Sequence, residues 1–228
     1  MLGLVIETST ERAVAAIFNG TECLFYEELP FGIQNSHLLL PDLQKKIAGK
    51  SFKIKDLDFI SVGIGPGSYT GIRIGVTIAK ILAFALDIPL VGICTLDAFI
   101  PEKEGVFAAL IDAKIGGVYL QTGRLKNNVV ELLTEPKAYS LAEAAEVLHD
   151  IPTIVTPNAD KIRSKLEALK PQNGWHWQER YPQVAQLVRI AHRKMEEGNV
   201  AEEQHLELLY MRKTQAEIER DLKKSVLS

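Results

Sequence analysis

A glycine-rich stretch restricts the fold of this 228-residue chain more than any other feature of its sequence. Residues 63–75 read Gly-Ile-Gly-Pro-Gly-Ser-Tyr-Thr-Gly-Ile-Arg-Ile-Gly. The apolar run Phe59–Val62 leads into the stretch, and the longer apolar run Ile72–Leu86 leads out of it. We therefore predict a strand, a tight turn and a helix, an order that points backbone N–H groups and the positive end of a helix dipole at an anion.

Two familiar phosphate-binding motifs do not fit this stretch. A Walker loop closes with Gly-Lys-Ser or Gly-Lys-Thr, which is missing here, and Pro66 and the glycine spacing break the dinucleotide-binding fingerprint. A plain structural turn and an anion-binding turn therefore both stay open. In the second interpretation, Gly65, Gly67 and Ser68 would supply the anion contacts.

Composition and charge exclude some classes of protein. A hydrophobic content of 46% and a charged content of 24% are typical of a folded globular protein. The net charge of −3 provides no basic field that would hold nucleic acid. Cys23 and Cys94 lie far apart in the sequence, which favours free thiols in a reducing compartment.

We predict a cytoplasmic location and no membrane span. The N-terminus has neither a charged leader nor a small-residue cleavage site. Arg73 and Lys80 interrupt the most apolar run, Ile72–Leu86, so we do not expect this segment to cross a membrane.

The sequence after residue 105 repeats the pattern at the N-terminus. With a shift of 105 residues, Leu4–Thr8 aligns with Ala109–Ala113, and Ala13–Ile17 aligns with Val118–Thr122. Both copies read as an apolar strand, an acidic residue, a turn and a second strand. This pattern predicts an α/β protein with two duplicated βββαβα lobes.

The repeat also gives the predicted domain organisation. We expect the first lobe to span residues 1–104 and to hold the glycine motif and the interface helices. The second lobe is expected to span residues 105–212, and a polar tail is expected at 213–228.

Glu7 and Asp112 each end an apolar strand and enter a short turn, a placement that resembles the two phosphate loops of the actin, Hsp70 and sugar-kinase (ASKHA) architecture. In that architecture an acid holds Mg²⁺ through water or acts as a base, while hydroxyls such as that of Thr8 hold phosphate oxygens. The alternative is that both acids simply end strands at the surface. Only Gly174 and Gly198 follow residue 124, so the second lobe lacks the glycine pair that would pack on adenine, and we expect no ATP binding by the chain alone.

Metal and nucleophile sites receive little support from the sequence. No two of the five histidines are three or four residues apart, so no helix would present a paired metal face. His37 lies near a predicted helix start, but Pro41 occupies the position four residues later. No serine lies in a Gly-x-Ser-x-Gly elbow, and we predict neither catalytic nor metal-binding residues.

The segment Thr70–Leu86 is apolar almost all round a helical projection, so it must be buried on more than one side. Gly71 and Gly75 lie four residues apart, which would allow the backbone of another helix to approach closely. We predict that one side of this helix belongs to the core and that another side forms a subunit interface. A wholly internal core helix is the alternative.

Five collinear motifs resemble the bacterial TsaB (YeaZ) family and together span nearly the whole chain. They are Ile6–Thr10, Gly65–Gly75, Ile111–Lys114, Gly117–Tyr119 and Leu209–Arg212. The resemblance implies the ASKHA fold, with a degenerate second lobe, and a relationship to TsaD, the enzyme that places threonylcarbamoyl on adenosine 37 of tRNA.

The resemblance further implies a non-catalytic subunit that pairs with a TsaD-like enzyme or with itself, works with a TsaE-like ATPase, and meets tRNA only indirectly. It implies no cofactor of its own, and ATP with Mg²⁺ only within the complex. The family usually has Asp where this chain has Glu7, which weakens a phosphate role for the first loop. The partner-interface residues that it implies are Ser36, His37, Leu40, Gly71, Arg73, Ile74, Gly75 and Ile78.

Two rival functions stay open at this point. The first is an ASKHA-type ATPase or phosphotransferase that uses Glu7, Asp112 and the amides of residues 65–68. The second is a metallopeptidase-like protein, which bound zinc or iron would reveal.

Overall fold

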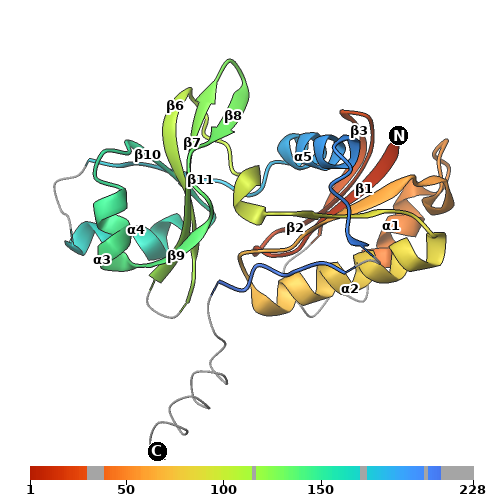
Figure 1. The fold of residues 1–228 in the computed structure, drawn as a ribbon, viewed down its shortest axis with the longest axis horizontal. Coiled ribbons are helices and arrows are strands. Elements are labelled where there is room, and N and C mark those ends of the chain that lie inside the picture. Colours follow the sequence, from red (N-terminus) through yellow and green to blue (C-terminus); the bar gives the residue numbers. More distant parts are fainter. Residues whose placement is uncertain (30–38, 115–116, 170–173, 203–204, 212–228) are drawn as a thin grey trace, which may run out of the picture.

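The computed structural model describes residues 1–29, 39–114, 117–169, 174–202 and 205–211, and they form two lobes, each built on a mixed β-sheet (Figure 1). In chain order, the first lobe contains β1 (Leu2–Glu7), β2 (Ala13–Asn19), β3 (Glu22–Leu29), α1 (Leu39–Ile47), the 3₁₀ helix η2 (Ile54–Asp56), β4 (Phe59–Gly63), α2 (Tyr69–Leu86), β5 (Leu90–Ile93) and the 3₁₀ helix η3 (Thr95–Ala98). The chain continues with β6 (Gly105–Asp112), β7 (Gly117–Lys126), β8 (Val129–Leu132), β9 (Lys137–Ser140), α3 (Leu141–Val147), β10 (Thr153–Thr156), α4 (Ala159–Leu169), β11 (His176–Glu179) and α5 (Val184–Glu196).

The two sheets share one topology, which confirms the predicted duplication. The first sheet has the strand order β3-β2-β1-β4-β5, and the second has the equivalent order β8-β7-β6-β10-β11, with β9 also paired to β7. In both sheets the first two strands are antiparallel, while the later strands run parallel to the first strand or to each other. Glu7 and Asp112 end the equivalent strands β1 and β6. This is the ASKHA arrangement that the sequence predicts.

Helices cover both faces of the first sheet (Figure 1). α1 and α2 lie on one face, where Leu43, Ile72 and Val76 join the core formed by β1, β2 and β4. α5 lies on the opposite face, where Leu187 and Val188 pack with residues of β1, β2 and β5. Both faces of this sheet are therefore buried, and its central strands show no alternation between apolar and polar residues.

The chain returns to the first lobe after the second sheet is complete, which corrects the predicted boundary. α5 packs on the first sheet, and Leu206 and Leu208 contact the core under α2. The prediction of a second lobe that reaches residue 212 is therefore wrong for residues 184–211. The predicted polar tail, residues 213–228, lies outside the described residues.

The sequence does not predict the strands β8, β9 and β11 of the second sheet. β8 is mostly exposed, and β9 is exposed or half-buried, so neither carries the apolar alternation that marks a strand. Trp175 and Trp177 flank the start of β11, and the indole N–H of Trp175 donates a hydrogen bond of 3.0 Å to the backbone carbonyl of Leu148.

Candidate functional site

The loops that follow β1, β4 and β5 meet at one edge of the first sheet, because these three strands are parallel neighbours. Thr8 follows β1, the glycine turn follows β4, and Thr95 follows β5. The structure therefore brings together the first-lobe residues that the sequence predicts as anion contacts. These residues are Glu7, Thr8, Gly65, Gly67 and Ser68.

The carboxylate of Glu7 points into the lobe, and the residue is 0% exposed. Its Oε1 accepts a hydrogen bond of 2.5 Å from the backbone N–H of Ser9, and its Oε2 accepts one of 2.9 Å from the hydroxyl of Thr95. A Cβ atom on Gly63 would lie 2.1 Å from Oε2, so the adjoining strand leaves room only for glycine. Burial raises the pKa of Glu7, although its hydrogen bonds act in the opposite direction. A cation or phosphate could reach the Glu7 carboxylate only by breaking these hydrogen bonds, and such a contact stays a prediction.

The glycine turn lies flat against the loop that follows β1. The backbone N–H of Ser68 donates to the carbonyl of Ser9 at 2.7 Å, and a Cβ atom on Gly67 would lie 2.3 Å from the same carbonyl oxygen. The side chain of Ser68 caps α2 by accepting a hydrogen bond from the N–H of Gly71. Gly65 has a φ of 99°, and a Cβ atom there would lie 3.3 Å from the carbonyl of Leu209. The turn thus makes close contacts with the protein itself, which favours the structural interpretation.

Asp112 occupies the equivalent position in the second lobe and is half-buried. Its backbone N–H donates to Oδ1 of Asn158 at 3.4 Å, and its own Oδ1 accepts from the N–H of Lys114 at 3.0 Å. An ion pair of 3.5 Å between Lys161 and Glu11 joins α4 of the second lobe to the loop after β1 of the first lobe. An anion contact by Asp112 stays a prediction.

The two glycines of α2 face the inside of the first lobe. A Cβ atom on Gly71 would lie 2.1 Å from the carbonyl oxygen of Thr8, and a Cβ atom on Gly75 would lie 2.2 Å from the Thr8 hydroxyl. Both glycines are buried, and the Thr8 hydroxyl donates a hydrogen bond of 2.7 Å to the carbonyl of Gly71. They bring α2 close to the loop after β1 of their own lobe. The prediction that Gly71 and Gly75 contact a partner helix is therefore wrong.

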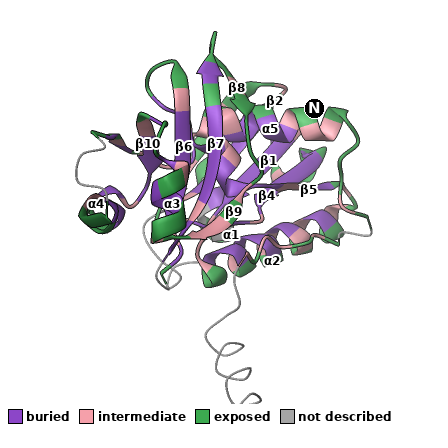
Figure 2. Ribbon diagram, turned by 60° about the vertical axis from the view of Figure 1, so that its left-hand side comes forward, coloured by how far each residue is buried: buried purple, intermediate pink, exposed green. Residues whose placement is uncertain are grey.

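The other side of α2 is open to solvent (Figure 2). Arg73 is exposed, Ile74 and Ile78 are half-buried, and Ile81 and Phe84 are 58% and 79% exposed. We call Ile74, Ile78, Ile81 and Phe84 the outer stripe of α2. Three predicted interface residues, Arg73, Ile74 and Ile78, thus lie on this side of the helix, whose use as an interface stays a prediction.

The remaining predicted interface residues are not described structurally. Ser36 and His37 lie outside the described residues. Leu40 belongs to α1, and its side chain is likewise not described. Within the described part of the chain, no three His, Cys, Asp or Glu side chains group in a way that could hold a metal ion.

By length and composition alone, α2 could cross a membrane, in spite of Arg73 and Lys80. The prediction that these two charges disqualify the segment is therefore too strict. Its packing instead identifies α2 as a core helix of an α/β lobe, because Ile72, Val76 and Ala79 are buried against the first sheet.

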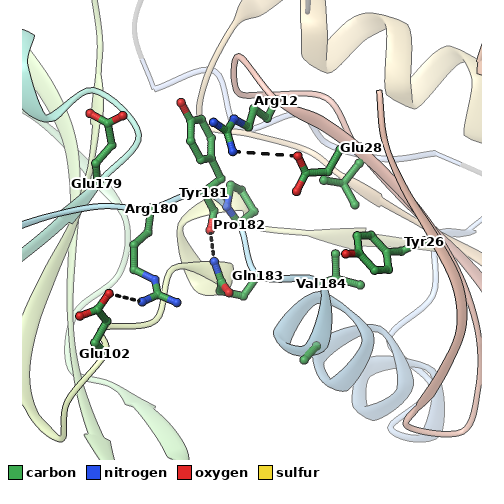
Figure 3. A pocket seen from close by; sticks show the side chains of 12 residues that line it. Arg12, Tyr26, Glu28, Glu102, Glu179, Arg180, Tyr181, Pro182, Gln183 and Val184 are labelled. Atoms are coloured by element: carbon green, nitrogen blue, oxygen red, sulfur yellow. Dashed lines mark hydrogen bonds and ion pairs between the residues drawn. The ribbon is translucent and has the colours of Figure 1, made fainter. Parts of the chain in front are cut away.

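A cavity of about 460 Å³ opens between the lobes, near the start of α5 (Figure 3). The guanidinium of Arg12 lies 4.3 Å from the ring centre of Tyr181 and 4.0 Å from the carboxylate of Glu28. On the other side, Arg180 donates a hydrogen bond of 3.0 Å to Glu102. Each arginine that lines the cavity thus has a carboxylate partner, and the contact between Arg12 and Tyr181 links the two lobes.

Three residues of the first lobe and the segment packed on it were not among the predicted site residues. Thr95 could have been found, because it follows a strand parallel to β4 and its side chain must reach the same sheet edge. The exposure of Ile81 could not have been predicted, because apolar residues occur nearly all round α2. The rings of Tyr69 and Tyr210 lie 4.9 Å apart. This contact could not have been predicted either, because the two residues are 141 positions apart and no local sequence pattern relates them.

Comparisons with known proteins agree with this geometry. A family model described as TsaD, tRNA N6-adenosine threonylcarbamoyltransferase, matches residues 34–178. The tRNA threonylcarbamoyladenosine biosynthesis protein TsaB of Bacillus subtilis is 38% identical over 99 residues, which cover 42% of this chain and 43% of that protein. For TsaB of Buchnera aphidicola the identity is 31% over 184 residues, which cover 75% of this chain and 78% of that protein.

The chain spans about half the length of several of the curated relatives that it matches, including TsaB of Escherichia coli, which is 34% identical with 52% of its length covered. Among solved structures, YeaZ from Pseudomonas aeruginosa superposes with a TM-score of 0.73 at 22% identity, covering 92% of this chain and 100% of that one. A second structure from this bacterium, described as an uncharacterized protein similar to peptidase YeaZ, gives a TM-score of 0.77 at 20% identity, covering 92% and 99%. These structures show the same fold, and the sequence matches show that the chain belongs to the TsaB (YeaZ) family of TsaD-like proteins.

Proposed function

We propose that this chain is a non-catalytic subunit required for threonylcarbamoylation of adenosine 37 in tRNA. It pairs with a TsaD-like enzyme, works with a TsaE-like ATPase in the cytoplasm, and meets tRNA only through the complex. The observation that carries the proposal is membership of the TsaB family, whose curated members bear the name of tRNA threonylcarbamoyladenosine biosynthesis proteins.

The hydrogen bonds at the end of β1 and in the loop that follows it support a non-catalytic role for the chain. Glu7 is fully buried and hydrogen-bonded to Ser9 and Thr95, so a substrate or cation would have to break these contacts to reach the carboxylate. The backbone N–H of Ser68 already donates to the protein. The chain would hold no cofactor of its own, and ATP with Mg²⁺ would bind only within the complex.

The outer side of α2 is the surface that we propose for the partner. Apolar residues at 74, 78, 81 and 84 follow one another along the helix, and Arg73 adds a charge beside them. A stable interface buries about 1,600 Å² in total, so neighbouring elements would have to contribute as well. A TsaD-like enzyme and a second copy of this chain would compete for the same side.

A matched pair of substitutions tests this proposal. Ile81→Asp places a charge on the outer stripe, and Leu169→Asp does the same on α4, where the leucine is 50% exposed. We expect Ile81→Asp to abolish co-purification with a TsaD-like enzyme, and Leu169→Asp to leave it unchanged, with both variants folded by circular dichroism. Stoichiometric co-purification of Ile81→Asp would contradict the interface assignment.

A second candidate function is that the chain is itself an enzyme, as in the rival interpretation of an ATPase or phosphotransferase, and one observation favours catalysis in general. The family model that matches residues 34–178 bears the name of an enzyme. Titration of the isolated chain with Mg-ATP separates the two functions, because micromolar binding with turnover that Glu7→Ala removes would support the enzyme. We expect neither binding nor turnover.

A further inference from the structure

Two connections between the described elements join the lobes, and they contact each other (Figure 1). Residues 99–104 lead from the first lobe into the second, and residues 180–183 lead back to α5. The backbone N–H of Glu102 donates a hydrogen bond of 2.9 Å to Oε1 of Gln178, and Arg180 donates one of 3.0 Å to Glu102. Short connections of this kind form a hinge about which two lobes can turn.

The loop between β1 and β2 bridges the lobes at a second place. The carboxylate of Glu11 lies 3.5 Å from the Nζ of Lys161, in the first turn of α4. The guanidinium of the next residue, Arg12, lies 4.3 Å from the ring centre of Tyr181, in the connection that leads back (Figure 3). Two neighbouring residues of a single first-lobe loop thus contact α4 and the hinge.

Contacts inside the first lobe hold this loop in place. The backbone N–H of Ser68 donates to the carbonyl of Ser9 at 2.7 Å, and the hydroxyl of Thr10 donates to the carbonyl of Arg12 at 3.0 Å. The guanidinium of Arg12 also lies 4.0 Å from the carboxylate of Glu28 in β3. The loop therefore presents its charged side chains to the second lobe through contacts that do not depend on that lobe.

Both contacts between the lobes are weak enough to be reversible. The side chains of Glu11 and Lys161 are 51% and 65% exposed, and an ion pair at such a site favours the bound arrangement by about threefold. A cation–π contact at an exposed site, such as that of Arg12 with Tyr181, contributes a similar factor. Together the two contacts would favour one arrangement of the lobes by about tenfold.

We propose that Glu11 and Arg12 form an electrostatic latch that holds the two lobes at one angle in the isolated chain. Breaking their contacts with Lys161 and Tyr181 lets the lobes turn about the two connections. The latch consists of the chain's own side chains, so it closes without a bound ligand. A tenfold preference corresponds to about nine latched molecules in ten.

Pulsed electron paramagnetic resonance on the full chain measures the angle as a distance between the lobes. Nitroxides are attached to Thr77→Cys in α2 and Ala142→Cys in α3, two exposed positions, in a Cys23→Ser background. Cys94 is buried, and burial raises the pKa of its thiol, so it is not labelled. We expect one main distance and a second population of about one-tenth.

A charge reversal tests the ion pair directly. Glu11→Lys places two like charges beside each other and should raise the second population to about one-third. Lys161→Glu added to that variant reverses the pair and should return the population to about one-tenth. Arg12→Gln alone should raise it to about one-quarter. A population that either single substitution leaves unchanged, or that Lys161→Glu fails to restore, would overturn the proposal.

Two controls complete the test. Arg163→Gln removes an ion pair of 2.8 Å with Glu167 inside α4 and should leave the distances unchanged. Raising the salt concentration from about 0.01 M to about 1 M shortens the Debye length from about 30 Å to about 3 Å, so the second population should increase in the parent chain. An effect of Arg163→Gln like that of Glu11→Lys, or distances that do not respond to salt, would contradict an electrostatic latch. The measurement uses no partner, so its result does not depend on the proposed function.

Discussion

The hydroxyl of Thr95 donates a hydrogen bond of 2.9 Å to the Oε2 of Glu7 inside the first lobe. Glu7 ends β1 and Thr95 follows β5, and these two strands run parallel to β4 on either side of it. The hydrogen bond therefore crosses the edge of the sheet next to the glycine turn. The carboxylate thereby serves the fold at the position where ASKHA enzymes place an acid beside bound phosphate. Two of the predictions below, both made for Glu7→Gln, follow from this arrangement.

The stability contributed by Glu7 should decrease as the pH rises. Burial raises the pKa of this carboxyl above its ordinary value of 4.5, so the folded state binds the proton more tightly than the unfolded state does. Its contribution is therefore complete below that value and is lost as the pH rises through the folded-state pKa. Glu7→Gln should remove this slope, which urea unfolding of both proteins at a series of pH values from about 4.5 upward would measure. A wild-type stability that increases with pH relative to the variant would contradict the prediction.

Gly75→Ala should destabilise the first lobe. The added methyl would meet the Thr8 hydroxyl at 2.2 Å, and overpacking of this kind costs about 1–3 kcal/mol of unfolding free energy. Thr77→Ala, at an exposed position of α2, is the matched control and should change stability by less than about 0.5 kcal/mol. If Gly75→Ala unfolded at the wild-type urea concentration but no longer bound a partner, the glycine would belong to an interface after all.

Tyr210→Ala should loosen the segment that crosses the glycine turn. The substitution removes the hydrogen bond from Arg73 and the stacking on Tyr69, which together stabilise the contact by about 1 kcal/mol at an exposed site. Hydrogen exchange of the Leu209 amide, which donates to the carbonyl of Ile64, should become faster, while exchange in β6 stays unchanged. Equal exchange rates at Leu209 in both proteins would show that the tyrosine does not hold the segment.

The sequence predicts the architecture better than it predicts the orientation of side chains. The repeat at a shift of 105 residues places Glu7 and Asp112 on equivalent strand ends, and the structure has them at the ends of β1 and β6. The direction of Glu7 could not be predicted, because β1 is buried on both faces and shows no alternation. The inward orientation of Gly75 was hidden for a similar reason, since apolar residues occur nearly all round α2.

The sequence pattern also did not predict that the chain returns from the second lobe to the first. α5 carries the apolar periodicity of a surface helix, but this periodicity does not specify which sheet the helix covers. The structure places it on the first sheet, 165 positions after β2 ends at Asn19, where Leu187 and Val188 meet Phe18. Only long-range packing decides such a choice.

The central claim is that the chain supports a reaction without carrying out its chemistry. Formation of threonylcarbamoyladenosine on tRNA, reconstituted with a TsaD-like enzyme, a TsaE-like ATPase and this chain, tests it most directly. We predict product only when the chain is present, with Glu7→Gln as effective as the wild type and Ile81→Asp inactive. Full product without the chain, or activity that disappears in a folded Glu7→Gln variant, would contradict the account.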